Sequence, residues 1–121
     1  MKAALRSIET PEGESLDTIR PDSGSFCIPV LALIGPEGED GEEIFQFEVC
    51  SPDWLAQELE AYPAIWGDRR LIMSHYDPVA IETHVRKRLR HAIGTDWNSV
   101  AQKIGQWATW EFEEYTPYNG S

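Results

Sequence analysis

The sequence predicts an α+β fold in which an antiparallel or mixed β-sheet carries three helices packed mainly on one face, in the order βββαβααβ. Two observations support this class. Residues 1–50 contain short apolar runs with alternating hydrophobicity, which is typical of strands. Later residues carry apolar side chains three and four positions apart behind helix-capping residues, which is typical of amphipathic helices. Because the first three strands are close in sequence, we expect them to pair antiparallel under a cover of helices.

The N-terminal segment supplies one strand and one long loop. Residues 2–9, KAALRSIE, alternate weakly and are compatible with a first strand. Residues 10–24 contain two Pro, two Gly and several small polar residues, which indicates a loop. We expect one turn in this loop, anchored by Leu16 and Ile19.

A β-hairpin is expected next. Residues 25–34 are apolar on both faces, which favours a buried strand, and Pro29 requires a bulge or a position without a ladder partner. Residues 35–42, GPEGEDGE, hold three glycines and four carboxylates and are typical of an extended hairpin loop. Residues 43–50 alternate clearly. The side chains expected on the buried face of this last strand are Phe45, Phe47 and Val49.

The first helix should follow the hairpin directly. Ser51 is a good N-cap, Pro52 fits the first helical position, and Asp53 suits the positive helix terminus. We expect the helix to end near Pro63, before a fourth strand within 69–76. The apolar residues at helical spacing are Leu55, Leu59 and Tyr62.

Two more helices and a final strand complete the prediction. Asp77 and Pro78 begin a helix that should run over 78–93 and stop at Gly94, with a buried stripe of Ile81, Val85, Leu89 and Ile93. A third helix should begin at Thr95 or Asp96 and bury Trp97, Val100, Ala101, Ile104 and Trp107. Trp110 and Phe112 then alternate with Glu111 and Glu113, which predicts a strand that ends near Tyr115.

The chain is the size of one domain and is strongly acidic. Its 121 residues carry 21 acidic and 10 basic side chains, a net charge of −11, so we expect one domain over residues 1–121. Residues 1–60 hold 14 carboxylates against Lys2, Arg6 and Arg20, so the acidic excess lies in the first half. Such a field repels nucleic acid and anionic lipid and attracts basic partners, although acidic surfaces also aid solubility.

The sequence favours a cytoplasmic protein without cofactors. It shows neither a signal peptide nor an apolar run long enough to span a membrane. Cys27 and Cys50 do not form a zinc-binding spacing, and we expect buried thiols that lie almost opposite each other on the hairpin. The sequence also contains no phosphate-binding glycine loop and no dinucleotide fingerprint.

Histidine and basic residues leave two minor alternatives. His75 and Asp77 at a strand end could form a catalytic pair, but a surface histidine beside a helix cap explains both residues equally well. His84 and His91 lie seven residues apart on one helix, which is too far for chelation. The basic stretch on that helix could contact nucleic acid, although we expect it to pair with the protein's own carboxylates. It comprises Arg86, Lys87, Arg88, Arg90 and His91.

An ordered set of segments over most of the chain resembles the immunity protein 8 family of bacterial polymorphic toxin systems. The segments are KAALRSIE, IGPEGEDGEEIFQFEVC, SPDWL, TDW and WEFEEY. The resemblance implies a small cytosolic protein that binds and neutralises a cognate toxin domain and has no active site and no cofactor. Many toxin domains are nucleases with basic clefts, and the acidic charge independently fits a basic partner.

The expected contact surface follows from the density of charge. The candidate toxin-binding residues are the carboxylates of the hairpin loop and its base, with two later glutamates as a second choice: Glu37, Glu39, Asp40, Glu42, Glu43, then Glu111 and Glu113. A homodimer, an acidic interaction module that mimics nucleic acid, and a small enzyme that uses His75 stay open as alternatives.

Overall fold

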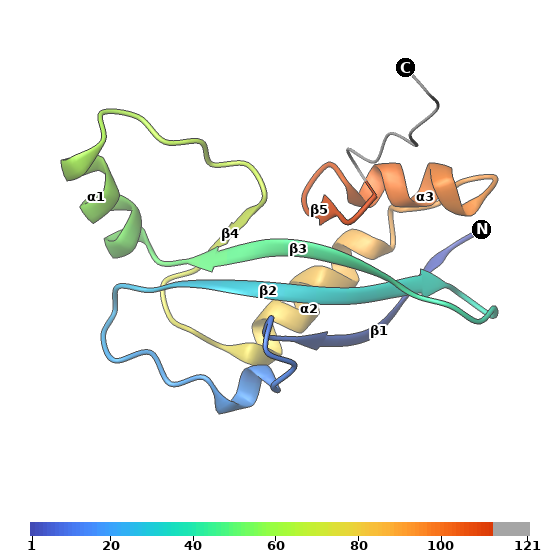
Figure 1. Ribbon diagram of the computed structural model, residues 1–121, viewed down its shortest axis with the longest axis horizontal. Helices are drawn as coiled ribbons and strands as arrows, with labels where there is room; N and C mark the ends of the chain where they lie inside the picture. The colour runs from blue at the N-terminus through green and yellow to red at the C-terminus, as the bar shows by residue number, and fades with distance from the viewer. Residues whose placement is uncertain (113–121) are drawn as a thin grey trace, which may run out of the picture.

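The computed structural model describes residues 1–112 and contains a five-stranded mixed sheet (Figure 1). β1, β2 and β3 form an antiparallel meander, and β4 and β5 both pair with the other edge of β3, β4 in parallel and β5 antiparallel. β3 is therefore the central strand, with neighbours on both sides. The bounds are β1 Ala3–Glu9, β2 Cys27–Pro36, β3 Glu43–Cys50, β4 Arg70–Ile72 and β5 Thr109–Trp110.

Three α-helices and one short 3₁₀ helix complete the fold and confirm the predicted order βββαβααβ. They are η1 Leu16–Thr18, α1 Pro52–Ala61, α2 Pro78–Leu89 and α3 Trp97–Ile104. The three α-helices begin at the predicted caps, because the side chains of Ser51, Asp77 and Asp96 accept hydrogen bonds from backbone N–H groups of the first turn. Within residues 1–112 we find no helix with the length and apolar character needed to cross a membrane.

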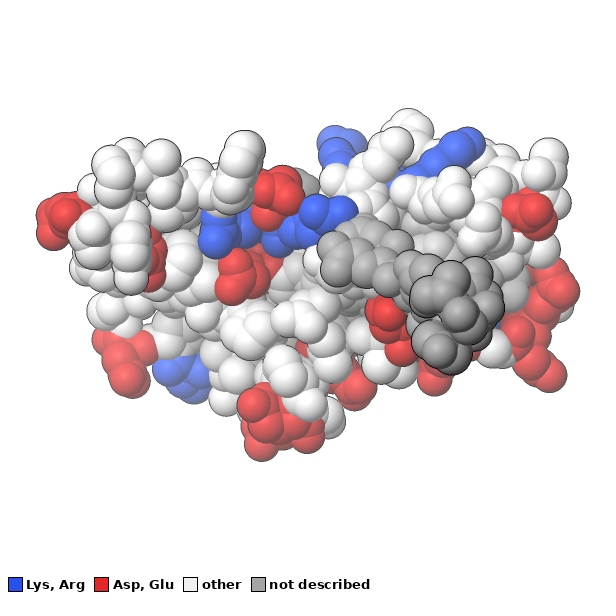
Figure 2. Space-filling view, turned by 45° about the horizontal axis from the view of Figure 1, so that its top comes forward, with Lys and Arg blue, Asp and Glu red and all other residues white. Residues whose placement is uncertain are grey.

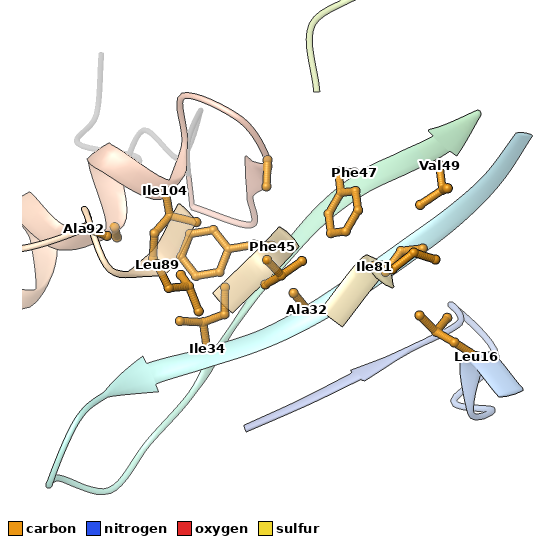
Figure 3. Packing of buried hydrophobic residues seen from close by; sticks show 14 of the residues in the cluster. Leu16, Ala32, Ile34, Phe45, Phe47, Val49, Ile81, Leu89, Ala92 and Ile104 are labelled. Carbon is orange, nitrogen blue, oxygen red and sulfur yellow. The ribbon is translucent and has the colours of Figure 1, made fainter. Parts of the chain in front are cut away.

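The core lies between one face of the sheet and helices α2 and α3. Phe45, Phe47 and Val49 are buried on the predicted face of β3. Figure 3 shows Phe45 among Ile34, Leu89 and Ile104, which come from β2, α2 and α3. Each fully buried side chain of this size stabilises the fold by roughly 1.5–3 kcal/mol. This apolar layer joins the sheet to α2 and α3.

Strand β2 is buried on one face instead of both. Val30, Ala32 and Ile34 face the core, whereas Leu31 and Leu33 are half-exposed because α2 and α3 cover only the other face. Pro29 occupies the kind of position that its missing N–H requires. It lies before Leu31, the first residue of β2 that pairs with β1, so no strand on that side needs its N–H. On the other side, the opposing residue Glu48 of β3 donates its own N–H to the carbonyl of Arg69 and not to β2.

Helix α2 ends earlier than the sequence predicts. The prediction of a helix over 78–93 is correct to Leu89 and wrong beyond it, because Arg90 is the C-cap and the N–H groups of His91 and Ala92 donate to the carbonyl groups of Arg88 and Leu89. Ala92 is consequently buried and Ile93 is 46% exposed. The N–H of the next residue, Gly94, donates to the Met1 carbonyl, and the Gly94 carbonyl accepts from the N-terminal ammonium group. These two hydrogen bonds hold the segment after α2 against the N-terminus.

The final strand is also shorter than predicted. β5 contains Thr109 and Trp110, and a turn follows at Glu111 and Phe112, so the alternation of aromatic and acidic residues does not continue as a strand through residue 112. The aromatic side chain of Trp110 stacks on Phe45, with ring centroids 6.3 Å apart. Glu113 and Tyr115, which were expected in this strand, lie outside the described residues.

Helix α1 lies apart from the other two helices (Figure 1). None of its residues is buried, although Leu55 and Trp54 are half-buried. Ser51 anchors its start, because this buried hydroxyl oxygen accepts hydrogen bonds from the N–H groups of both Trp54 and Phe26. The expectation that the helices pack on one face therefore describes α2 and α3, while α1 projects from the end of β3.

Candidate functional site

The hairpin loop at residues 35–42 is held in place by the N-terminal strand. The Arg6 guanidinium donates to the carbonyl oxygens of Pro36 and Glu39. The N–H of Glu37 donates to the carbonyl of Lys2 over 2.9 Å. These contacts use backbone atoms of the loop, so they fix its position and leave its carboxylates unengaged.

Four carboxylates project from this loop into solvent. Glu37, Glu39, Asp40 and Glu42 are all exposed. Within residues 1–112 none of the four forms an ion pair with Lys or Arg. Figure 2 shows the resulting acidic patch at the end of the molecule where the loop lies. The loop therefore presents several like charges together on an ordered support.

The two other described candidates make contacts with the protein itself. The carboxylate of Glu43 accepts a hydrogen bond from the indole N–H of Trp97. The carboxylate of Glu111 accepts from the N–H of Ile44 over 2.9 Å, and its backbone N–H donates to the Ile44 carbonyl. Glu43 thus links the base of the hairpin to α3, and Glu111 links it to the residue that follows β5. Glu113, the remaining candidate, lies outside the described residues.

A second exposed surface, which we call the α1 surface, lies at the opposite end of the molecule (Figure 1). It consists of Leu59, Tyr62 and Trp66, which are 49%, 58% and 85% exposed. The spacing of Leu59 and Tyr62 is that of a core-facing stripe, so the sequence does not predict their exposure. Trp66 is one of three tryptophans, with Trp54 and Trp110, that the sequence offers as the contact if the loop is not the binding surface. Trp54 and Trp110 differ from Trp66 in that both are half-buried.

The pair of His75 and Asp77 does not form a catalytic arrangement. Asp77 is the N-cap of α2 and accepts from the N–H groups of Val79 and Ala80. His75 is exposed, and it makes no hydrogen bond or ion pair with any residue of the described chain. The geometry therefore supports a helix cap beside a surface histidine.

The predicted proximity of Cys27 and Cys50 is confirmed. The two residues pair across β2 and β3, and their Sγ atoms are 3.1 Å apart. Together with Glu48 they are the one group of three potential metal ligands within residues 1–112. However, Glu48 is engaged by Arg70 over 3.0 Å, and burial raises the pKa of both thiols, which opposes the thiolate form that metals bind.

The cations of α2 are less neutralised than expected. Arg86 pairs with Glu82 over 3.0 Å, as predicted. For Lys87, Arg88 and Arg90 the prediction is wrong, because none of them pairs with a carboxylate of the described chain. The excess of carboxylates lies mainly on the first half of the sequence, and the fold does not bring those groups to this helix.

Comparison with known families agrees with the resemblance seen in the sequence. The model of the family described as Immunity protein 8 matches residues 3–115. The match includes the hairpin, all three helices and the described strands. No curated protein and no solved structure matches the chain in the corresponding searches.

Proposed function

The chain belongs to the immunity protein 8 family, and from this premise we propose that it binds a cognate bacterial toxin domain in the cytoplasm and neutralises it without catalysis. The whole chain acts as one domain in this proposal. The observation that carries the binding mode is the group of exposed, unpaired carboxylates on the anchored hairpin loop. An immunity protein needs a stable surface that recognises one partner, and a charged loop on a rigid sheet supplies one.

The partner surface should be basic. A net charge of −11 and the acidic loop attract a cationic surface and can raise its association rate by roughly 10–10³. We propose that Glu37, Glu39, Asp40 and Glu42 contact the toxin directly. Glu43 and Glu111 support the loop base, and Glu113 adds charge as the second choice. A basic cleft of a nuclease toxin is one surface of this kind, and the same field disfavours nucleic acid itself as a partner.

The α1 surface is the alternative contact. Exposed Trp and Tyr side chains are enriched among residues that dominate binding energy at protein interfaces. Because the loop and the α1 surface lie at opposite ends of the molecule, substitutions at one end leave the other unchanged. The two surfaces can therefore be tested separately.

The test of the function starts from the adjacent reading frame, and a toxin domain encoded there is produced together with this protein. We expect the two proteins to co-purify and the immunity protein to prevent growth arrest when the toxin is expressed. Absence of both co-purification and protection would contradict the proposed function. Loss of protection in a folded His75→Ala variant would instead support the enzyme alternative.

The loop is tested by reversing its charge. The triple variant Glu37→Lys, Glu39→Lys, Asp40→Lys should slow toxin association steeply at low salt, since steering charges act mainly on association rate. The matched control is Glu12→Lys, Glu14→Lys, Asp22→Lys, which makes the same change in net charge at three exposed carboxylates of the 10–24 segment. Stopped-flow measurements at several salt concentrations give both rates. Equal slowing in the two variants would show that only net charge matters and that the loop is not the contact.

A further inference from the structure

A pocket of about 490 Å³ lies between strands β3 and β4, helix α2 and the segment after α3. Its volume is in the range of small-molecule sites. One part of its wall is apolar and is formed by Phe47, Leu71, Val85 and Trp107. The other part carries basic and imidazole groups, from Arg70, His84, Lys87, Arg88 and His91. Figure 2 shows Lys and Arg side chains gathered near the middle of this face, with Asp and Glu side chains beside them and around the rim.

Two cations of this pocket lack a carboxylate partner among residues 1–112. Lys87 and Arg88 have no carboxylate partner within the described chain, and Arg88 instead lies over the ring of Trp107, with its Cζ 5.8 Å from the ring centroid. Cations that lie close together repel each other, and the apolar wall reduces screening by water. A bound anion would offset this repulsion.

Arg70 adds a further cation to the lining of the pocket. Its guanidinium lies over Trp54 and donates from Nε to Glu48. The Nη1 atom of the same group is buried and has no hydrogen-bond partner among residues 1–112. Buried guanidinium N–H groups are nearly always paired, so the positive charge of Arg70 is only partly compensated by residues 1–112.

We propose that this pocket binds a monovalent carboxylate carried on an apolar body. Guanidinium groups recognise carboxylates through charge-assisted hydrogen bonds, and the wall of Phe47 and Trp107 matches an aromatic or aliphatic body. Glu48 beside Arg70 and the net charge of −11 disfavour anions of higher charge, such as phosphate monoesters. This site is independent of the proposed toxin contact at the hairpin loop and does not require it.

Direct titration of the purified full-length protein tests the site. The probe is phenylacetate, followed by the chemical shift of the Trp107 indole N–H. Phenylacetamide has the same shape without the charge, acetate lacks the apolar body, and inorganic phosphate carries more charge. We expect saturable binding of phenylacetate and much weaker binding of the other three. No saturable shift with phenylacetate, or equal binding of phenylacetamide, would overturn the proposal.

Helix α2 supplies a matched pair of variants. Lys87→Gln with Arg88→Gln removes two charges from the pocket, and Arg86→Gln with Arg90→Gln removes two charges from the same helix outside it. Because charge-assisted hydrogen bonds are strong, we expect the first variant to bind phenylacetate about tenfold more weakly and the second to bind it almost normally. Thermal melting checks that both variants are folded. An equal loss of phenylacetate affinity in the two variants would mean that only net charge matters and would overturn the proposed site.

The carboxylate could belong to a free small acid or to a side chain of a partner protein, and competition separates these sources. Saturating phenylacetate is added to the complex with the neighbouring toxin domain. Release of the toxin assigns the carboxylate to the partner. An unchanged complex, with phenylacetate still bound, assigns the pocket to a free acid.

Discussion

Cys27 and Cys50 face each other across strands β2 and β3 in a partly desolvated position. Desolvation raises the pKa of both thiols above the ordinary value of about 8.5. Only the thiolate is a good nucleophile. The folded protein should therefore keep both groups as unreactive thiols at pH 8, in reducing and non-reducing buffer alike.

Alkylation with iodoacetamide at pH 8 tests this expectation. The native protein should react slowly and the protein in denaturant should react at both positions. Above pH 8.5 the unfolded chain loses thiol protons that the folded chain retains, so the free energy of unfolding should fall as pH rises through this range and be unaffected by these thiols below it. Rapid modification of either cysteine in the native state would contradict the raised pKa.

Single residues were predictable where their partners are near in sequence or follow from strand register. The opposition of Cys27 and Cys50 follows from their equal distances from the hairpin loop. The roles of Glu43 and Glu111 did not follow, because their partners, Trp97 and the backbone of Ile44, are 54 and 67 residues away. A pattern of acidic residues does not reveal which carboxylates are already used inside the fold.

At the scale of elements, the hairpin depends on close contact between the two sides of its loop. A Cβ atom at Gly35 would lie 1.9 Å from the carbonyl oxygen of Gly41, so the backbone has to move to accept Ala. We expect Gly35→Ala to cost about 1–3 kcal/mol of stability, as overpacking does. Gly67→Ala is the control, because a Cβ there meets no atom within 4 Å.

Urea denaturation of both variants measures this difference. The control should change stability by less than about 0.5 kcal/mol, as most surface substitutions do. Gly35→Ala should also slow toxin association if the loop is the contact surface, because the carboxylates lose their fixed arrangement. A Gly35→Ala variant as stable as the wild type would show that the loop can open without cost.

The α1 surface should contribute little to folding. Tyr62 and Trp66 are mostly exposed, and α1 buries no residue. The double variant Tyr62→Ser, Trp66→Ser should therefore change the free energy of unfolding by less than about 0.5 kcal/mol per site. Ile81→Ala, in the core face of α2, should cost about 2–5 kcal/mol in the same urea assay. A large loss in the double variant would mean that this surface stabilises the fold.

Element starts were easier to predict than element ends and packing. The caps Ser51, Asp77 and Asp96 act on the N–H groups of the next few residues, so local sequence determines them. The apolar spacing continues to Ile93, so it did not reveal that α2 ends at Leu89 and that Gly94 beyond it contacts Met1, 93 residues away. The isolation of α1 likewise depends on where β3 ends in space, which apolar spacing does not encode.

At the scale of the whole molecule, acidic and basic side chains gather in separate regions, and the charge counts along the sequence indicated only the acidic region. The acidic excess of the first half was visible in the sequence, and the fold concentrates part of it in the hairpin loop. The basic pocket was not visible, because it combines Arg70 of β4 with residues of α2 and Trp107. Only the tertiary structure brings these segments together.

The clustering of loop carboxylates should lower the stability of the free protein. Glu37, Glu39 and Asp40 have no cationic partner in the described chain, so their mutual repulsion opposes the folded loop. The isosteric variant Glu37→Gln, Glu39→Gln, Asp40→Asn removes this repulsion. We expect its Tm to exceed that of the wild type at low ionic strength. The difference should disappear near 1 M salt, where the Debye length is about 3 Å.

Calorimetry at both salt concentrations, with Glu12→Gln, Glu14→Gln, Asp22→Asn as the matched control, separates local repulsion from net charge. A smaller gain in the control than in the loop variant would mean that the loop keeps its charges at a cost in stability, which a basic partner would offset. Equal gains would assign the effect to the net charge of −11 alone.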